Sequence, residues 1–378
     1  MLPLSGYRVV DITRLLPGGF CSYLLSAYGA EVVKVEEPGL GDYLRETPPL
    51  LDGVSLVHTM INRGKRSIGI DLKKEGGKRV LRRLVERSDV MIEGFRPGAV
   101  DDLGFSFEEV KKINRRVVYC SISSFGRDSV LSSMPAHDLN FEAMSGLLGS
   151  GGEPQVPFVQ LGDYVGGMYA ALGIMAALLR KERMATHVDV PIVQSLMSLL
   201  VLPASSYFTT EEPPARGQSL VFGSEPYYAI YQTSDKRYMA VAAIESHLWK
   251  NLVRKMGIEN LGRLRDGSKK DRQHLHAEMQ RAFASRTQAE WTEILMDSDT
   301  CVTPILDIHE ALDSLWAREA GVIGRAGGRP VLNQPLRFSE VTEDKDAPSL
   351  GEHTRSILRE LGYSRAEVQH LFKSRAVA

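Results

Sequence analysis

Two titratable side chains, His137 and Asp163, stand where two apolar stretches of the sequence are expected to become helices. His137 precedes a segment expected to be helical over 139–148, and Asp163 precedes a more apolar one over 164–180. The first backbone N–H groups of a helix have no partner within it, so a helix start suits anions and developing negative charge. A base, an acid and free donors converging here would suit proton transfer beside a carbonyl, or attack of a carboxylate on an acyl group.

Both acidic residues of these stretches also have a simpler explanation. An Asp before an apolar helix usually caps it by accepting a backbone hydrogen bond, and Asp138 fits the same role as Asp163. A lone His beside a helix start is more often structural than catalytic. The two residues by themselves therefore favour capping, and a catalytic role depends on the rest of the chain.

The elements that must position these side chains alternate between strand and helix in the first half of the chain. Strands are expected over 7–13, 31–36, 67–72, 90–95 and 117–123. Helices are expected between them, over 20–28, 76–86 and 107–113. This alternation predicts an α/β fold: an open, Rossmann-like parallel sheet with right-handed crossovers and helices on both faces. Ligands of such sheets bind beyond the carboxyl ends of the strands.

Three loops of this sheet carry features that would suit a phosphorylated ligand. The P-G-G turn at 17–19 could hold a phosphate, but it lacks the G-x-G-x-x-G and G-K-[ST] spacings, and close packing of helix on strand explains it equally well. Arg96 follows the fourth strand. Arg63, Lys65 and Arg66 precede the third strand, so topology alone does not place them at the ligand end. Singly, such cations are more often solvated surface charges.

The second half of the chain is organised differently. A short strand over 187–190 and a helix over 192–202 are followed by T-T-E-E-P-P-A-R-G at 209–217, the clearest linker in the sequence. Beyond it, two strands joined by a polar turn precede several helical segments. This pattern predicts a second, smaller α+β domain.

The bulk composition excludes several classes of protein. The 378 residues suggest two or three domains, and a net charge of −1 favours neither a nucleic-acid partner nor a membrane surface. The N-terminus has no apolar signal core, and no stretch reaches the roughly 18 uncharged apolar residues of a membrane span. Cys21, Cys120 and Cys301 are widely spaced, without metal-ligand spacing or a disulfide pattern. We expect a cytoplasmic protein with no metal, nucleic-acid partner or membrane span.

Seven motifs, in order along the chain, carry a resemblance to a known family. They are L-S-G-Y-R-V-V-D at 4–11, G-A-E-V-V-K-V-E-E-P at 29–38, N-R-G-K-R-S-I-G-I-D-L-K at 62–73, E-G-F-R-P-G at 93–98, H-D-L-N-F-E-A-M-S-G at 137–146, G-D-Y-V-G-G at 162–167 and G-E-H-T at 351–354. Each is weak alone, but together and in this order they are specific. Over nearly its whole length the sequence resembles the family III CoA-transferases (CaiB/BaiF type), which include the α-methylacyl-CoA racemases.

The resemblance implies a two-domain subunit in an interlocked homodimer, in which each chain threads through the other. It implies a large CoA-binding domain at 1–208, a small domain at 218–322, and a C-terminal segment at 323–378 that returns to the large domain. It also implies an acyl-CoA thioester as substrate, with no permanently bound cofactor.

The same resemblance gives the cationic loops a task. Arg63, Lys65, Arg66 and Arg96 become candidates for contacts to the phosphates of CoA, which suit cationic side chains and the planar fork of arginine especially. The chain departs from the racemases at Glu37, where they often carry an Arg. If the ligand needs the contact that this Arg makes in the racemases, another residue of this chain must supply it.

Two reactions run on this fold. In the transferases, an Asp that resembles Asp163 attacks the donor thioester and carries the acyl group as a mixed anhydride. In the racemases, a His and the same Asp stand on opposite faces of the α-carbon, and one removes the α-proton while the other returns it. The racemase His matches His137, and a third acidic residue of the racemases resembles Glu245, which could orient His137 or share a proton with it.

The motifs favour the racemase reaction over the alternatives. His137 and Glu245 match it, and the G-G-G-G-Q loop of formyl-CoA transferases has no counterpart in S-L-V-F-G-S-E-P at 219–226. In the other direction, E-E-P-G-L-G-D-Y-L-R and Q-L-G-D are closer to transferase-like members. A CoA-transferase is therefore the second hypothesis. A non-catalytic acyl-CoA-binding protein, which would keep the cationic loops but could lose His137 or Asp163, is the third.

Overall fold

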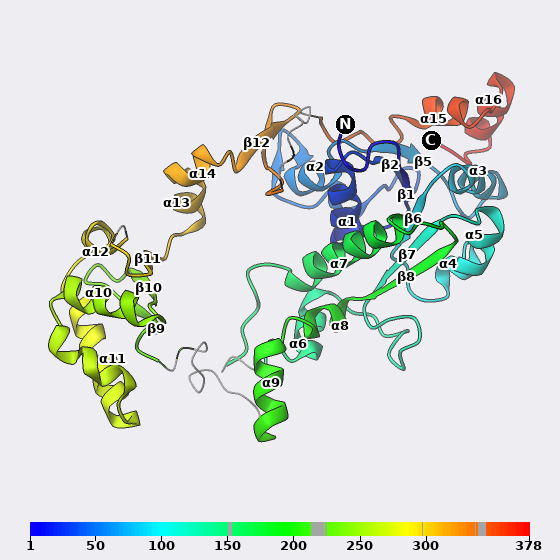
Figure 1. Ribbon diagram of the computed structural model, residues 1–378. Coiled ribbons are helices and arrows are strands. Elements are labelled where there is room, and N and C mark those ends of the chain that lie inside the picture. The colour runs from blue at the N-terminus through cyan, green and yellow to red at the C-terminus, as the bar shows by residue number, and fades with distance from the viewer. Residues whose placement is uncertain (150–152, 213–222, 224, 297, 337, 339–344) are drawn as a thin grey trace. The chain divides into compact units, whose positions relative to one another are not determined.

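The computed structural model of the chain describes residues 1–149, 153–212, 223, 225–296, 298–336, 338 and 345–378 (Figure 1). These residues form two compact units. The larger contains 1–147, 155–199 and 316–378, and the smaller contains 148–154 and 200–315. The linker predicted at 209–217 and the loop at 219–226 fall largely outside the described residues, as does the expected domain boundary at 218.

The larger unit is built on a six-stranded sheet in which every neighbouring pair is parallel. Its strands are β1 (Arg8–Asp11), β2 (Glu31–Glu36), β5 (Arg66–Gly69), β6 (Val90–Glu93), β7 (Val118–Ser123) and β8 (Thr186–Pro191). Their order, β5-β2-β1-β6-β7-β8, runs outward in both directions from a switch point between β1 and β6. This is the Rossmann strand order, and the predicted parallel sheet is confirmed.

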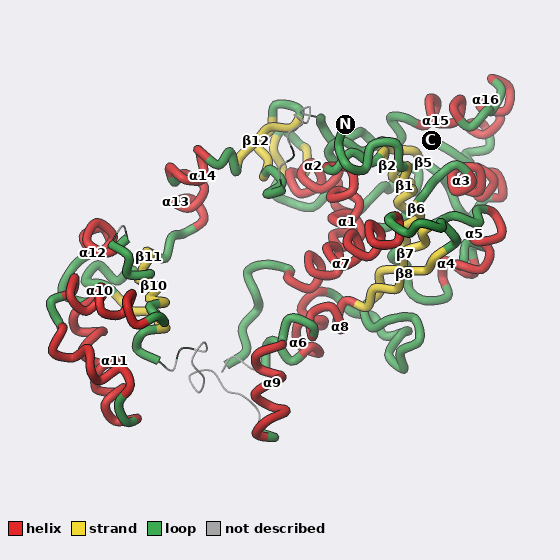
Figure 2. The backbone as a smooth tube through the Cα atoms, viewed as in Figure 1, coloured by secondary structure: helices red, strands yellow, loops and turns green. Residues whose placement is uncertain are grey.

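Helices cover both faces of this sheet (Figure 2). One face packs against α1 (Leu15–Ala27), α6 (Asp138–Ser145), α7 (Leu161–Leu178) and α8 (Ile192–Met197). The other packs against α3 (Glu75–Glu86), α5 (Phe107–Ile113), α15 (Thr354–Glu360) and α16 (Arg365–Lys373). Successive strand residues point to opposite faces, so Val9 joins the first core and Val10 the second. Burial on both faces explains the continuous apolar runs of the strands.

The start of α1 differs from the sequence prediction. The helix begins at Leu15, not at residue 20, because Pro17 is tolerated in a first turn, where its missing N–H would have had no partner. A Cβ at Gly18 would lie 2.3 Å from the Thr13 side chain, and one at Gly19 would lie 2.8 Å from Cγ2 of Ile61. The P-G-G turn therefore serves close packing, the simpler of its two interpretations.

The longest apolar helix of the unit, α7, is a core helix. It is the one described helix that is long and apolar enough to cross a membrane by length and composition, yet half of it is buried. A Cβ at Gly167 would lie 2.7 Å from the Pro17 carbonyl oxygen of α1, and one at Gly166 would lie 2.8 Å from Ile192 of α8. These two glycines let α7 pack closely against both neighbours.

The remaining elements of the larger unit are short or peripheral. They are η1 (Tyr43–Arg45), β3 (Leu50–Leu51), β4 (Val54–Ser55), α2 (Leu56–Asn62), α4 (Ala99–Asp102), β12 (Ile323–Ala326) and β13 (Arg329–Leu332). The helix α14 (Leu315–Glu319) begins at the boundary between the units.

The smaller unit has an antiparallel sheet in the order β11-β10-β9. Its strands are β9 (Tyr228–Gln232), β10 (Tyr238–Ala242) and β11 (Val302–Pro304). Its helices are α9 (Val201–Thr210), α10 (Ser246–Met256), η2 (Glu259–Asp266), α11 (Lys269–Phe283), α12 (Gln288–Leu295) and α13 (Ile308–Asp313). The single helix expected over 192–202 is in fact two, α8 and α9, which fall in different units.

Candidate active site

Asp163 is the third residue of α7, inside its first turn. The sequence prediction began this helix after Asp163, and Gln160, which stands at the N-cap position, makes no side-chain capping bond. The caps come instead from α6. The backbone N–H of Asp163 donates to Oδ1 of Asp138 at 3.0 Å, and the N–H of Leu161 donates to Oε1 of Glu142 at 3.2 Å. Two donors that we expected to be free for negative charge are thus already occupied.

Asp163 and Glu142 hold their protons unusually tightly for carboxyl groups. Burial, followed by the charge of Asp138, raises the pKa of Asp163 from 3.8 to about 7. Burial also raises the pKa of Glu142 to about 7, with a hydrogen bond and charge repulsion from Asp138 adding to it. A carboxyl with such a pKa can both accept and donate a proton near neutral pH, which an ordinary Asp cannot.

His137 lies at the same junction. It is the exposed N-cap residue of α6, and its backbone N–H donates to Oδ1 of Asn140 at 3.0 Å. The next residue, Asp138, holds the backbone of Asp163. The structure thus brings the two predicted catalytic residues to one helix–helix contact, through a residue that we had interpreted only as a local cap.

The first turn of α7 also lies beside the start of α1. The rings of Tyr164 and Phe20 meet edge to face with centroids 4.9 Å apart, and Tyr164 packs against the cluster of Leu16, Leu44 and Ile61. Because α1 follows β1 directly, this contact places Asp163 toward the carboxyl end of β1, beside the switch point of the sheet. Ligands of Rossmann-like sheets bind at that point.

A buried ion network fixes the loop between β1 and α1. Nζ of Lys34 lies 3.0 Å from Oδ2 of Asp42 and 3.6 Å from Oδ2 of Asp11, and all three side chains are buried. Burial acts to raise the pKa of Asp11, but Lys34 and Lys65 together hold it below its ordinary value. Oδ1 of Asp42 accepts the N–H of Leu15, whose φ of +63° is a strained value for leucine. The network thereby positions the first residue of α1.

Arg96 lies at the ligand end of the sheet. It follows β6, the strand on the other side of the switch point, and its side chain is exposed. The loop is held by Glu93, whose carboxylate accepts the N–H of Phe95 at 2.9 Å. No hydrogen bond or ion pair of the Arg96 side chain occurs among the residues that the structure describes. Its guanidinium is therefore free to contact an anion.

The other three predicted cations lie at the opposite, N-terminal end of β5 and are engaged within the chain. Nζ of Lys65 is buried and donates to Ser22 Oγ at 2.7 Å, Asn62 Oδ1 at 2.9 Å and the Gly19 carbonyl at 3.0 Å. All three of its donors are thus used, and a phosphate contact would break this set. The sequence showed the charge but not the burial.

The two neighbouring arginines are also paired. Arg66 forms ion pairs with Glu31 and Glu360, each at 2.6 Å. Arg63 donates to the Tyr23 hydroxyl, and to the Leu332 carbonyl at 2.7 Å.

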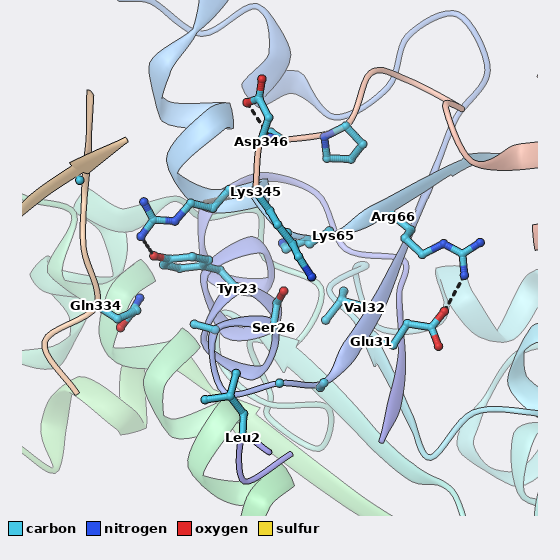
Figure 3. A pocket seen from close by; sticks show the side chains of 18 of the residues that line it. Leu2, Tyr23, Ser26, Glu31, Val32, Lys65, Arg66, Gln334, Lys345 and Asp346 are labelled. Atoms are coloured by element: carbon cyan, nitrogen blue, oxygen red, sulfur yellow. Dashed lines mark hydrogen bonds and ion pairs between the residues drawn. The ribbon is translucent and has the colours of Figure 1, made fainter. Parts of the chain in front are cut away.

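Both arginines line a cavity of about 1490 Å³, bounded by the end of α1, the starts of β2 and β5, and the segment around 345–349 (Figure 3). Figure 3 shows Arg66 directed toward Glu31. The size of the cavity does not make it the expected CoA site, because it lies at the amino ends of these strands.

Glu37, the departure from the racemase motif, is neutralised by two neighbours. Its carboxylate lies 2.7 Å from Nη2 of Arg14 and 3.2 Å from Nζ of Lys73. A hydrogen bond from Lys73, followed by one from Arg14, lowers the pKa of Glu37 despite partial burial. Arg14 follows β1 and Lys73 follows β5, so the carboxyl edge carries cations that the sequence reasoning missed. Their position directly after strands was the signal that could have identified them.

Glu245 belongs to the smaller unit, and its position is described within that unit alone. It stands before α10 as the N-cap residue, it is exposed, and its side chain makes no capping bond. Its proposed partnership with His137 stays a prediction. Within the described ranges, no group of three or more His, Cys, Asp or Glu side chains could hold a metal ion.

Comparison with known proteins places these features in context. A model of CoA-transferase family III matches residues 4–354. The α-methylacyl-CoA racemase of Mus musculus is 34% identical over 99% of this chain and 97% of its own length. The acetyl-CoA:oxalate CoA-transferase of Acetobacter aceti is 31% identical over 97% of each chain. A crystal structure of a CaiB/BaiF family protein from Brucella suis superimposes with a TM-score of 0.84 and 28% identity, covering 95% of this chain and 99% of that one.

Proposed function

Because the chain belongs to CoA-transferase family III, a family of enzymes, we propose that it transfers a proton at the α-carbon of an acyl-CoA thioester, as an α-methylacyl-CoA racemase does. In this reaction the Cα–H bond breaks, its electrons move into the thioester enolate, and a proton returns to the opposite face. His137 and Asp163 are the base and the acid. Their roles reverse between the two directions.

One observation carries this choice: the Asp163 carboxyl has a pKa of about 7. A general acid–base is most effective when its pKa lies near the working pH, because both protonation states are then populated. A nucleophile that forms an anhydride must be ionised, and this carboxyl is only about half ionised at neutral pH. Burial thus suits Asp163 better to proton transfer than to attack on a thioester.

The developing enolate needs a donor other than the two occupied N–H groups of α7. The N–H groups of Leu161 and Asp163 are bonded to Glu142 and Asp138, so neither is available to the thioester oxygen without breaking a cap. We therefore assign Asp163 to proton transfer alone, with the enolate oxygen held by other donors.

The phosphates of CoA are proposed to bind at the carboxyl edge of the sheet. Arg96 is exposed there, and Arg14 and Lys73 follow β1 and β5 on the same edge. Arg96 carries this assignment, because Arg14 and Lys73 are paired with Glu37 and would have to exchange it for a phosphate. Arg63 and Arg66 are paired at the opposite edge, and the three donors of the buried Lys65 ammonium are used within the chain.

A second copy of the chain is the proposed partner. Met168, Tyr169 and Leu172 of α7 have 47%, 39% and 58% of their surfaces exposed, although half of that helix is buried. In the smaller unit, α9 buries none of its residues and exposes Phe208 to 78%. Apolar surface of this extent usually marks a protein interface. An interlocked homodimer would cover both, and Leu172→Asp should shift the sedimentation coefficient from that of a dimer to that of a monomer.

CoA transfer between carboxylic acids is the second candidate function. It is favoured by the relative from Acetobacter aceti, an acetyl-CoA:oxalate CoA-transferase at 31% identity. In that reaction the ionised Asp163 attacks the thioester carbonyl, CoA leaves as a thiolate, and a mixed anhydride forms. The CoA thiolate then attacks the Asp163 carbonyl of this anhydride, which releases the donor acid and leaves CoA on Asp163 as a thioester. The acceptor carboxylate attacks that thioester to give a second anhydride, and the displaced CoA thiolate attacks the acceptor's acyl carbon, which frees Asp163.

The two reactions are separated by incubating the protein with a 2-methylacyl-CoA in D₂O, without an acceptor acid. Mass spectrometry follows deuterium at the α-carbon. We expect incorporation by the wild type and its loss in both His137→Ala and Asp163→Asn, with Asp52→Asn as an exposed control. No incorporation, together with CoA transfer to an added acid that only Asp163→Asn abolishes, would establish the transferase instead.

A further inference from the structure

The first turn of α7 is capped by a pair of carboxyls from another helix. Asp138 and Glu142 are four residues apart, so they lie on the same face of α6, one turn from each other. Asp138 accepts the N–H of Asp163 at 3.0 Å, and Glu142 accepts the N–H of Leu161 at 3.2 Å. A Cβ at Gly162, between these two, would lie 3.0 Å from Oδ1 of Asp138. The contact is close enough that only glycine fits there without a shift.

The two carboxyls also act on each other. Glu142 is 1% exposed, and burial, followed by a hydrogen bond with Asp138 and the charge of Asp138, raises its pKa to about 7. No cation influences Asp163 or Glu142 among the described residues, and the other titratable groups at the junction are His137, before Asp138, and Tyr164, after Asp163.

We propose that Asp138 and Glu142 are positioning residues for Asp163: they clamp the turn that carries it, and Asp138 supplies the negative charge that it faces. This inference rests on the catalytic role proposed for Asp163. The charge of Asp138 stays on the α6 side of the junction while Asp163 gains and loses its own proton.

The two functions of the clamp can be separated by substitution. Asp138→Asn keeps an oxygen that accepts the Asp163 N–H but removes the charge, whereas Asp138→Ala removes both. Glu142→Gln keeps an acceptor for Leu161 and a donor for Asp138, whereas Glu142→Leu keeps neither. We expect Asp138→Ala to lower kcat about a hundredfold, with KM changed less than about twofold, because a small displacement of a catalytic group is costly. Because it keeps the acceptor oxygen, Asp138→Asn should have a kcat about tenfold higher than that of Asp138→Ala.

The effect of the Asp138 charge on the pKa of Asp163 can be measured without following catalysis. In protein labelled with ¹³C at aspartate carboxyls, the Asp163 signal is identified by its absence in Asp163→Asn, and its titration midpoint is read directly. Removing the neighbouring charge in Asp138→Asn should lower this midpoint by about one pH unit. Asp52→Asn, an exposed aspartate of the same unit, should leave it in place.

An unchanged Asp163 midpoint in Asp138→Asn would overturn the inference, whatever reaction the protein runs. Equal kcat values for Asp138→Asn and Asp138→Ala would overturn the positional part, because the retained oxygen would then have no effect. If the wild type neither exchanges α-protons nor transfers CoA, while the midpoint falls as expected, the proposed function fails and the clamp stands.

Discussion

The substitution Asp163→Asn should stabilise the protein while abolishing its activity. The backbone N–H of Asp163 that bonds to Asp138 is kept in the variant, and the side chain changes little in size. What disappears is a carboxylate that burial and a neighbouring negative charge both disfavour. Catalytic groups are often held at such a cost to stability.

The magnitude follows from the pKa of Asp163, which rises from 3.8 to about 7 on folding. Each pKa unit corresponds to about 1.4 kcal/mol, so ionising this group in the folded state costs at most ~4 kcal/mol. Asp163 keeps some contact with solvent, and allowing for it roughly halves the figure, to about 2 kcal/mol. The folded state binds the proton more tightly than the unfolded state does. The wild-type free energy of unfolding therefore falls as pH rises from 3.8 to about 7, and this contribution is constant above that pH.

The assay is urea unfolding of the wild type, Asp163→Asn and the surface control Asp52→Asn, followed by circular dichroism. At about pH 8 we expect Asp163→Asn to unfold with a free energy about 2 kcal/mol higher than the wild type. At about pH 5, little more than a third of that gain should remain. Hydrogen exchange of α7 amides locates the effect in the larger unit. Equal stabilities at both pH values, or a gain that grows toward acid, would refute the account of a desolvated carboxyl.

Three further predictions concern the frame around Asp163 and the proposed phosphate contact of Arg96. Lys34→Met should lower the free energy of unfolding by about 3–5 kcal/mol in urea titrations, because it leaves the buried Asp42 carboxylate without its cation and Asp11 with Lys65 alone, and wild-type stability would contradict the ion network. Gly18→Ala should cost about 1–3 kcal/mol in the same titrations, since its Cβ would overlap Thr13, whereas Gly149→Ala, which meets open space, should cost little. Arg96→Ala should raise KM for the acyl-CoA about tenfold with kcat nearly unchanged, through loss of a charge-assisted contact. The matched control Arg63→Ala should leave KM unchanged. A raised KM in Arg63→Ala with an unchanged KM in Arg96→Ala would instead indicate that the phosphates bind at the opposite edge of the sheet.

Most of the sheet could be predicted from the sequence because its signals are local. The strand over 31–36 and the helix over 107–113 have the predicted bounds, since apolar runs and flanking turn residues mark them. The helix starts at Leu15 and Leu161 were predicted too late. In both cases the helix begins among residues whose conformation is fixed by distant partners, Asp42 for Leu15 and Glu142 for Leu161.

The candidate site was only partly predictable for the same reason. The motifs single out His137 and Asp163, and the structure brings them to one junction, while their catalytic roles stay predictions. The spacing of Asp138 and Glu142 places them on one helix face, but nothing local indicates that they cap another helix. Likewise, the positive charge of Lys65 gave no sign that its ammonium group would be buried, because burial of a charge depends on partners supplied by the fold.

The racemase assignment is tested most directly by stereochemistry. A single enantiomer of a 2-methylacyl-CoA is incubated with the protein together with an excess of a carboxylic acid acceptor, and the products are separated on a chiral column. We predict an equal mixture of the two enantiomers, with the CoA still on its original acyl group and the acceptor unchanged. Retained configuration, with CoA moved to the acceptor, would contradict proton transfer by His137 and Asp163 and make Asp163 the nucleophile of a transferase.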